Sequence, residues 1–137
     1  VSLEVPFRAH AGLTPGGGFL DFALEFGAAA GEPTGISTLF GFDAGTNAVR
    51  SWRFLNGGGR GTGTWTRGDR EITGTVRFVT GDGVVVTSKR RLALSDDGAL
   101  VVETTERRVG EEVLPALPPL VVKRMPAKQA ADAAGTK

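Results

Sequence analysis

The residues of this sequence that could do chemistry inside a protein are Arg50, Arg90 and Glu106, because each falls in a stretch typical of a β-strand rather than of a turn. Strand residues alternate between two faces, so each one shares its face with every second neighbour. Arg50 then shares a face with Trp52 and Phe54, and the other two share theirs with apolar neighbours. The pattern predicts charged groups that point into an apolar interior.

An interior arginine needs a partner, because an isolated charge taken out of water destabilises the fold by several kcal/mol. In one interpretation Glu106 neutralises Arg90 and the indole of Trp65 stacks on Arg50, which leaves a filled interior without a ligand. In the other, the arginines receive the carboxylate of an amphipathic ligand held in an apolar pocket. The walls of that pocket would be Phe22, Phe40, Trp52, Phe54, Trp65 and Phe78. A single bulge would instead turn the charged groups outward.

Other chemistry has little support in the residues. The chain has no cysteine and one histidine, His10, which falls on a polar strand face, so we expect no metal site and no cofactor. The adjacent carboxylates at 96–97 and 111–112 belong in turns or on opposite faces. The glycine run at 57–63 is not followed by a helix that could help to bind a phosphate. No catalytic residue is predicted, and the enzymatic alternative is an isomerase or cyclase with Glu106 as general acid or base.

Glycine clusters punctuate the chain, and the stretches between them are rich in Val, Thr, Phe and Leu. This pattern is typical of a β-meander, and helical periodicity is nearly absent. Strands are expected at 2–10, 19–29, 35–43, 47–55, 60–67, 70–80, 84–94, 99–109 and 119–125. The sequence therefore predicts an all-β, single antiparallel meander that closes into a lipocalin-like barrel of about 8–10 strands.

Two glycine-containing loops set the expected register around Trp65. A loop at 56–59 would place Arg50 opposite Trp65, so that a guanidinium lies over an indole. A two-residue loop at 68–69 would place Ile72 opposite Trp65 in the next strand.

Two later loops, at 81–83 and 95–99, fix the pairing of the strands between residues 70 and 109. The expected partners are Phe78–Val86, Ile72–Leu92, Gly74–Arg90, Leu94–Leu100, Leu92–Val102, Arg91–Glu103, Arg90–Thr104 and Ser88–Glu106. In this arrangement Arg91 and Glu103 form an ion pair on the outer face.

The chain is expected to form one domain over residues 1–126, followed by an alanine-rich tail at 127–137. The stretch 114–119 holds three prolines, which cannot donate hydrogen bonds to a sheet, so it should be an extended connector. We expect the tail to be mobile or to order only against a partner.

Charge and composition restrict the partners. Sixteen Lys and Arg against fifteen Asp and Glu leave a net charge of +1, which is too balanced to favour a nucleic acid or an anionic membrane. No apolar run is long enough for a transmembrane helix. The first residue is Val1 rather than Met, which suggests a processed or excised N-terminus that has lost a signal peptide or an upstream domain. Between these two, export to the periplasm of a bacterium is slightly favoured.

Several short motifs follow one another over residues 34–125. They are Gly41-Phe42-Asp43, Arg50-Ser51-Trp52, Gly61-Thr62-Gly63-Thr64-Trp65, Gly81-Asp82-Gly83, and Arg107 with Val109, Glu112, Leu114 and Pro115. In this order and spacing the chain resembles the lipocalin-like barrel domains of uncharacterised bacterial proteins. The resemblance implies a calycin-type barrel with no established reaction, and it implies ligand binding by analogy of fold alone.

The sequence thus predicts a non-enzymatic barrel that binds a small apolar or amphipathic molecule, such as one bearing a carboxylate. The candidate ligand-binding residues are Arg50, Trp52, Phe54, Trp65, Phe78, Arg90 and Glu106. The alternative is a ligand-free accessory module of a larger assembly, which would bind a protein partner through its outer face or its tail.

Overall fold

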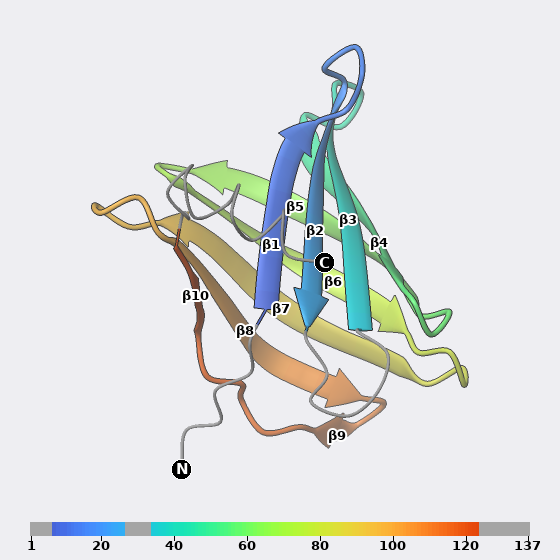
Figure 1. Cartoon of the computed structure of the whole chain (residues 1–137). Coiled ribbons are helices and arrows are strands. Elements are labelled where there is room, and N and C mark those ends of the chain that lie inside the picture. The colour runs from blue at the N-terminus through green and yellow to red at the C-terminus, as the bar shows by residue number, and fades with distance from the viewer. Residues whose placement is uncertain (1–6, 27–33, 124–137) are drawn as a thin grey trace, which may run out of the picture.

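The computed structural model describes residues 7–26 and 34–123, and these residues form strands and the turns between them (Figure 1). The start of the first expected strand, at 2–6, and the tail at 127–137 lie outside the described residues. The strands are β1 (Phe7–Leu13), β2 (Phe19–Phe26), β3 (Thr34–Asp43), β4 (Ala48–Leu55), β5 (Arg60–Gly68), β6 (Glu71–Val79), β7 (Val85–Leu94), β8 (Leu100–Val109), β9 (Glu112–Val113) and β10 (Leu120–Val122). The predicted all-β class is confirmed.

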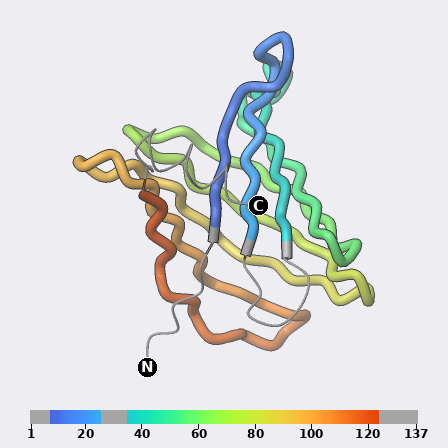
Figure 2. The backbone as a smooth tube through the Cα atoms, viewed as in Figure 1, coloured from blue at the N-terminus to red at the C-terminus, as the bar shows by residue number. Residues whose placement is uncertain are grey.

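Every strand from β1 to β8 pairs antiparallel with the next one along the chain, which confirms the predicted meander. Beyond β8 the sheet continues with the short strands β9 and β10, which pair with different parts of β8. Among the described residues no pairing joins β10 to β1, so the sheet is rolled up without closing into the expected barrel (Figures 1 and 2). The stretch 114–119, which holds three prolines, forms no strand, so β10 begins only at Leu120.

The roll is loosely filled. Trp65 and Val76 are the most buried large apolar residues of the described chain, at 3% and 4% exposure, and none of its large side chains is fully enclosed. Trp65 lies near the middle of the interior, with its ring centroid 5.7 Å from that of Phe40. An interior with one central aromatic cluster leaves room at both ends. The described residues include no helix that could cross a membrane.

Trp65 fits against the sheet because its neighbour across the strands is a glycine. The loop between β5 and β6 is formed by residues 69–70 rather than 68–69, so Trp65 pairs with Gly74 instead of Ile72. This shift of two residues leaves the faces of both strands unchanged. A Cβ on Gly74 would lie 2.8 Å from Cδ2 of the indole, which is too close for any other residue type without movement.

The register of β4 with β5 differs by one residue from the expected one. The loop begins at Asn56 but ends at Gly58, which has a φ of 87°, so it is one residue shorter than expected. A slip of one residue exchanges the two faces of a strand. The predicted inward placement of Arg50, Trp52 and Phe54 is therefore wrong, and all three lie on the outer face.

The expected pairing of β6 with β7 is confirmed, from Ile72–Leu92 to Phe78–Val86. The expected pairing of β7 with β8 is confirmed from Leu94–Leu100 to Arg90–Thr104. The predicted outer ion pair is present as well, with Arg91 Nη1 3.3 Å from Glu103 Oε1. The agreement ends at Ser88, where the pairing of β7 with β8 shifts.

Candidate functional site

A bulge in β8 decides which charged side chains enter the interior. The register shifts between Thr87 and Lys89, and opposite this point Glu106 has a positive φ of 49°. Glu106 consequently faces outward, where its Oε2 lies 3.0 Å from Lys89 Nζ. The predicted interior ion pair of Glu106 with Arg90 is therefore wrong. The extra residue brings Arg107 to the inner face in its place.

The inward position of Arg107 follows from the pairing beyond the bulge. Val109 is opposite Val86, which belongs to the inner face together with Phe78. Arg107 precedes Val109 by two residues and so shares its face. Its Nη1 donates a hydrogen bond to the carbonyl oxygen of Pro115 at 3.1 Å, in the extended connector.

The one-residue slip in β4 brings a second unexpected arginine inside. Ser51 faces inward, since it is 3% exposed and its Oγ accepts a hydrogen bond of 2.8 Å from Nε1 of Trp65. Arg53 lies two residues further on the same face, with its guanidinium carbon 5.8 Å from the ring centroid of Phe78. This is the only cation–π contact that Arg53 makes within the described residues.

Together, Arg53, Arg90 and Arg107 form an inner arginine cluster from β4, β7 and β8. Burial and, to a smaller extent, the charge of Arg90 together lower the pKa of Arg53 to about 10. Burial also lowers the pKa of Arg90, and the charge of Arg107 contributes to this lowering. The charge of Arg90 thus acts on Arg53, and the charge of Arg107 acts on Arg90.

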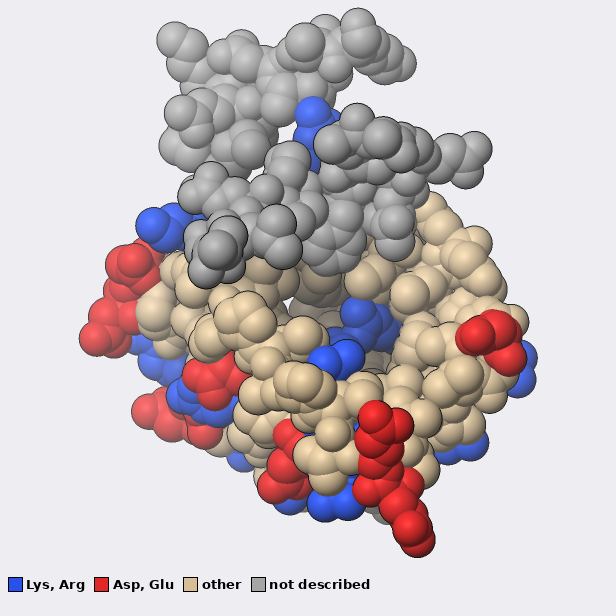
Figure 3. Space-filling view, turned by 90° about the horizontal axis from the view of Figure 1, so that it is seen from below, with Lys and Arg blue, Asp and Glu red and all other residues tan. Residues whose placement is uncertain are grey.

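The inner arginine cluster lacks counter-charges within the described residues. The Nε atoms of Arg53 and Arg90 are buried and have no hydrogen-bond partner. None of the ion pairs formed by residues 7–26 and 34–123 includes a member of the cluster. Seen from below, the molecule is hollowed, and atoms of Lys or Arg are visible in the hollow (Figure 3). A small anion would therefore meet unneutralised positive charge there.

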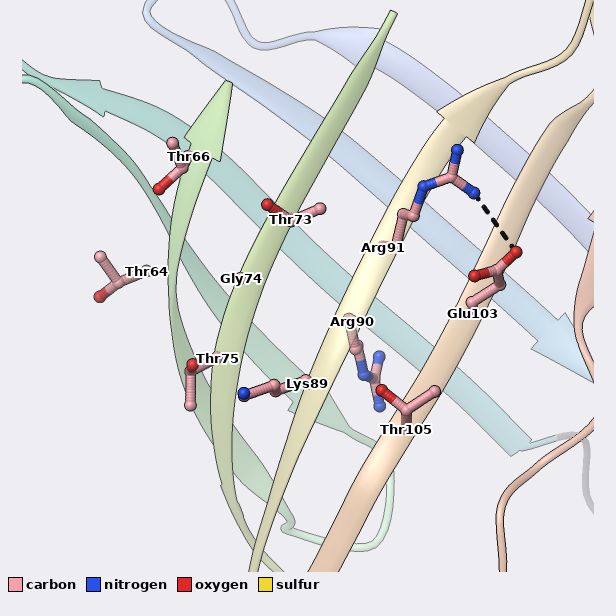
Figure 4. Close-up of a pocket in the computed structure, with 10 residues that line it drawn as sticks. All are labelled: Thr64, Thr66, Thr73, Gly74, Thr75, Lys89, Arg90, Arg91, Glu103 and Thr105. Carbon is pink, nitrogen blue, oxygen red and sulfur yellow. Dashed lines mark hydrogen bonds and ion pairs between the residues drawn. The ribbon is translucent and has the colours of Figure 1, made fainter. Parts of the chain in front are cut away.

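Three consecutive cations of β7 show the contrast between the two faces. Lys89 is paired with Glu106, and Arg91 is paired with both Glu71 and Glu103, at 2.6 and 3.3 Å. All of these pairs lie on the outer face. Arg90, between them in sequence, passes behind the ribbon of β7 in Figure 4 and pairs with none of the described carboxylates. Charge is thus neutralised outside and left open inside.

An apolar cavity of about 430 Å³ occupies the other end of the interior. Residues of the strands from β2 to β8 surround it: Leu20, Phe22, Phe40, Val49, Ile72, Leu92, Leu94 and Leu100, with Arg67, Gly68, Arg70 and Glu71 at the rim. This volume falls within the usual range of ligand pockets, about 300–1,000 Å³. Leu92 lines the cavity and Arg90 is the next inward residue of β7, about 7 Å further along the strand.

A second depression, of about 440 Å³, lies on the outer face (Figure 4). Threonines line much of it: Thr64, Thr66, Thr73, Thr75 and Thr105. Three cations also line it, and two of them, Lys89 and Arg91, already have carboxylate partners, whereas Arg90 has none among the described residues. The outer depression offers hydroxyl groups and no apolar wall, so it is the weaker candidate for an amphipathic ligand.

Of the predicted site residues, Trp65, Phe78 and Arg90 lie on the inner face and the others do not. Arg50, expected to stack on Trp65, instead has its Nε 3.1 Å from Asp43 Oδ2. Trp52 contacts Phe19 on the outer face, with ring centroids 6.1 Å apart.

Sequence reasoning missed Arg53 and Arg107. The more apolar alternation of β4, Arg50-Trp52-Phe54, favours the wrong face. The only signal for Arg53 is the length of the loop that follows. For Arg107 the signal is weaker still, because no glycine marks the bulge at Glu106.

Within the described ranges no group of three or more His, Asp or Glu side chains could hold a metal ion. Comparisons with family models, curated proteins and solved structures find no match to this chain.

Proposed function

We propose that the rolled sheet is a binding module for a small amphipathic molecule with an acidic head group. The head group would contact the inner arginine cluster, and the apolar part would occupy the cavity bounded by Leu92 and Phe22. The observation that carries the proposal is the buried, unpartnered Nε of Arg90 next to that cavity.

A charged group that is buried without partners destabilises a fold, and the Nε atoms of Arg53 and Arg90 are buried without a hydrogen-bond partner. An acid that binds in the interior would supply the missing acceptors, and a guanidinium can hold a carboxylate through two parallel hydrogen bonds. The same uncompensated charge would therefore become a source of affinity.

The apolar cavity supports the second half of the ligand. Each buried methylene group contributes about 0.8 kcal/mol, so a short alkyl chain would add affinity that a free anion lacks. Trp65, held by its hydrogen bond to Ser51, lies between the two regions and would contact the chain where it meets the head group.

Titration with a fluorescent fatty acid tests the proposal. We expect saturable binding by the parent protein and a loss of affinity of about tenfold or more in Arg90→Met, because a hydrogen bond to a charged group contributes about 1.5–3 kcal/mol. Lys89→Met is the matched control on the outer face and should bind like the parent. Absence of saturable binding in the parent protein would overturn the proposal.

One observation favours the accessory-module alternative. Three exposed aromatic residues lie on the outer face, namely Phe19, Trp52 and Phe54, at 45%, 37% and 53% exposure. Such a patch can contact another protein. Native mass measurement of the parent and of Trp52→Ser and Phe54→Ser, in extract from the source cell, tests this alternative. A complex that the substitutions abolish supports it, and a monomer throughout rejects it.

A further inference from the structure

We infer that the interior selects a doubly charged phosphate monoester over a singly charged carboxylate as the head group of its ligand. This inference rests on the proposed function and goes further, because it names the chemical class of the ligand. It is carried by the third arginine, Arg107, which the bulge at Glu106 brings to the inner face.

The charges set the preference. Without the bulge, the described residues at this end of the inner face would include Arg53, Arg90 and Glu106, with a summed charge of +1 that one carboxylate neutralises. With the bulge they include Arg53, Arg90 and Arg107, with a summed charge of +3. A carboxylate leaves two of these charges open, whereas a phosphate monoester carries about −1.5 to −2 at neutral pH. The dianion therefore gains more from the site than the monoanion.

The donors match the acceptors of a phosphate as well. A phosphate monoester offers three strong acceptor oxygens, while a carboxylate offers two. Two hydroxyl residues flank Arg90 on the inner face: Ser88 beside it in β7 and Thr104 opposite it in β8, at 7% and 9% exposure. With guanidinium groups arriving from three separate strands, the donors surround a tetrahedral group better than a planar one.

One described carboxylate on this side, that of Glu112, does not change the balance of charge. Glu112, in β9, is opposite Val109 near the rim, is exposed, and forms none of the ion pairs within the described chain. The arginine cluster lies towards the end of the roll that is open in Figure 3, since Arg53 and Arg107 come two residues before the ends of their strands. A strongly hydrated dianion can enter from this side without crossing the apolar cavity.

Calorimetric titration at pH 7.5 with octyl phosphate, octanoate, octanol and inorganic phosphate tests the inference. We expect octyl phosphate to bind at least about tenfold more tightly than octanoate, and octanol to bind weakly or not at all. Arg107→Met should remove most of this preference by weakening octyl phosphate more than octanoate. Arg107→Lys retains the charge and should retain much of the preference, which separates charge from the packing of the connector.

Arg108→Met is the matched control, since Arg108 is the exposed, outward neighbour in the same strand, and it should behave like the parent. Equal or tighter binding of octanoate by the parent protein would overturn the inference and leave the proposed function in place. No saturable heat with either amphiphile would overturn both. If inorganic phosphate binds as tightly as octyl phosphate, the dianion preference stands and the amphipathic ligand is rejected.

Discussion

Lys89 and Arg90 are adjacent in β7 and have opposite surroundings: Lys89 Nζ lies 3.0 Å from a carboxylate oxygen of Glu106, while Arg90 Nε is buried without a partner. The two residues therefore contribute differently to the stability of the fold. An exposed ion pair contributes little, whereas an uncompensated buried charge destabilises.

The first prediction concerns the stability of the ligand-free protein. Arg90→Met should raise the free energy of unfolding by about 1 kcal/mol or more, because it replaces the unpaired charge with an apolar side chain of similar length. Lys89→Met, the same change on the outer face, should have little effect. Urea unfolding followed by tryptophan fluorescence measures both. A less stable Arg90→Met protein would mean that the guanidinium is compensated within the fold.

The second prediction concerns the centre of the interior. Ser51→Ala removes the acceptor for the buried indole N–H of Trp65 and should lower the free energy of unfolding by about 1–3 kcal/mol. Ser37→Ala provides the matched control, because Ser37 is exposed on the outer face of β3. Equal unfolding midpoints for the two variants would show that the hydrogen bond is not needed.

The third prediction tests the bulge. Both Glu106→Asn and Glu106→Val lose the ion pair with Lys89, but only asparagine adopts a positive φ easily. The valine variant should be less stable than the asparagine variant by about 1 kcal/mol or more. At Thr105, whose φ is not positive, the order of stability should reverse. Thr105→Val should be more stable than Thr105→Asn, because valine favours a strand. The same order at both positions would contradict the bulge.

The fourth prediction concerns acid sensitivity. Hydrogen bonds to Asp43, first from Thr46 and then from the amide of Gly45 and from Arg50, lower its pKa below the ordinary 3.8. A carboxyl group whose folded pKa is depressed stabilises the fold above its unfolded pKa of about 3.9, and this contribution is lost as pH falls through the folded value.

Asp43→Asn should therefore be less stable than the parent at about pH 5 and above, and the difference should shrink below about pH 4. Urea unfolding at a series of pH values measures it. Asp69→Asn changes a carboxyl group with no hydrogen bond or ion pair of its own in the described structure, so its difference from the parent should vary much less. A constant difference for Asp43→Asn would contradict the assignment.

Turn chemistry explains why part of the fold could be predicted from the sequence. The loops at 81–83 and 95–99 each contain a glycine at the position that needs a positive φ, Gly83 and Gly98, so the registers of β6, β7 and β8 are well determined. The three consecutive glycines at 57–59 offer several such positions. Loop length is then undetermined, and with it the choice between Arg50 and Arg53 as the inward residue.

The bulge and the unclosed sheet could not be predicted for other reasons. Glutamate rarely takes a positive φ, so the residue type at position 106 gives no sign of a bulge there. Closure depends on whether β10 reaches β1, which is a long-range relationship rather than a turn signal. Of the three charged residues expected inside, Arg50, Arg90 and Glu106, only Arg90 lies on the inner face.

The bulge at Glu106 also has an evolutionary consequence. Glu106 and Arg107 are neighbours with opposite charge, and one extra residue in the pairing of β8 decides which of them faces inward. Gain or loss of a single codon in this strand can thus shift the interior by two charge units while the sheet remains the same. Insertions and deletions at this position therefore change the charge of the interior more than a typical single substitution does.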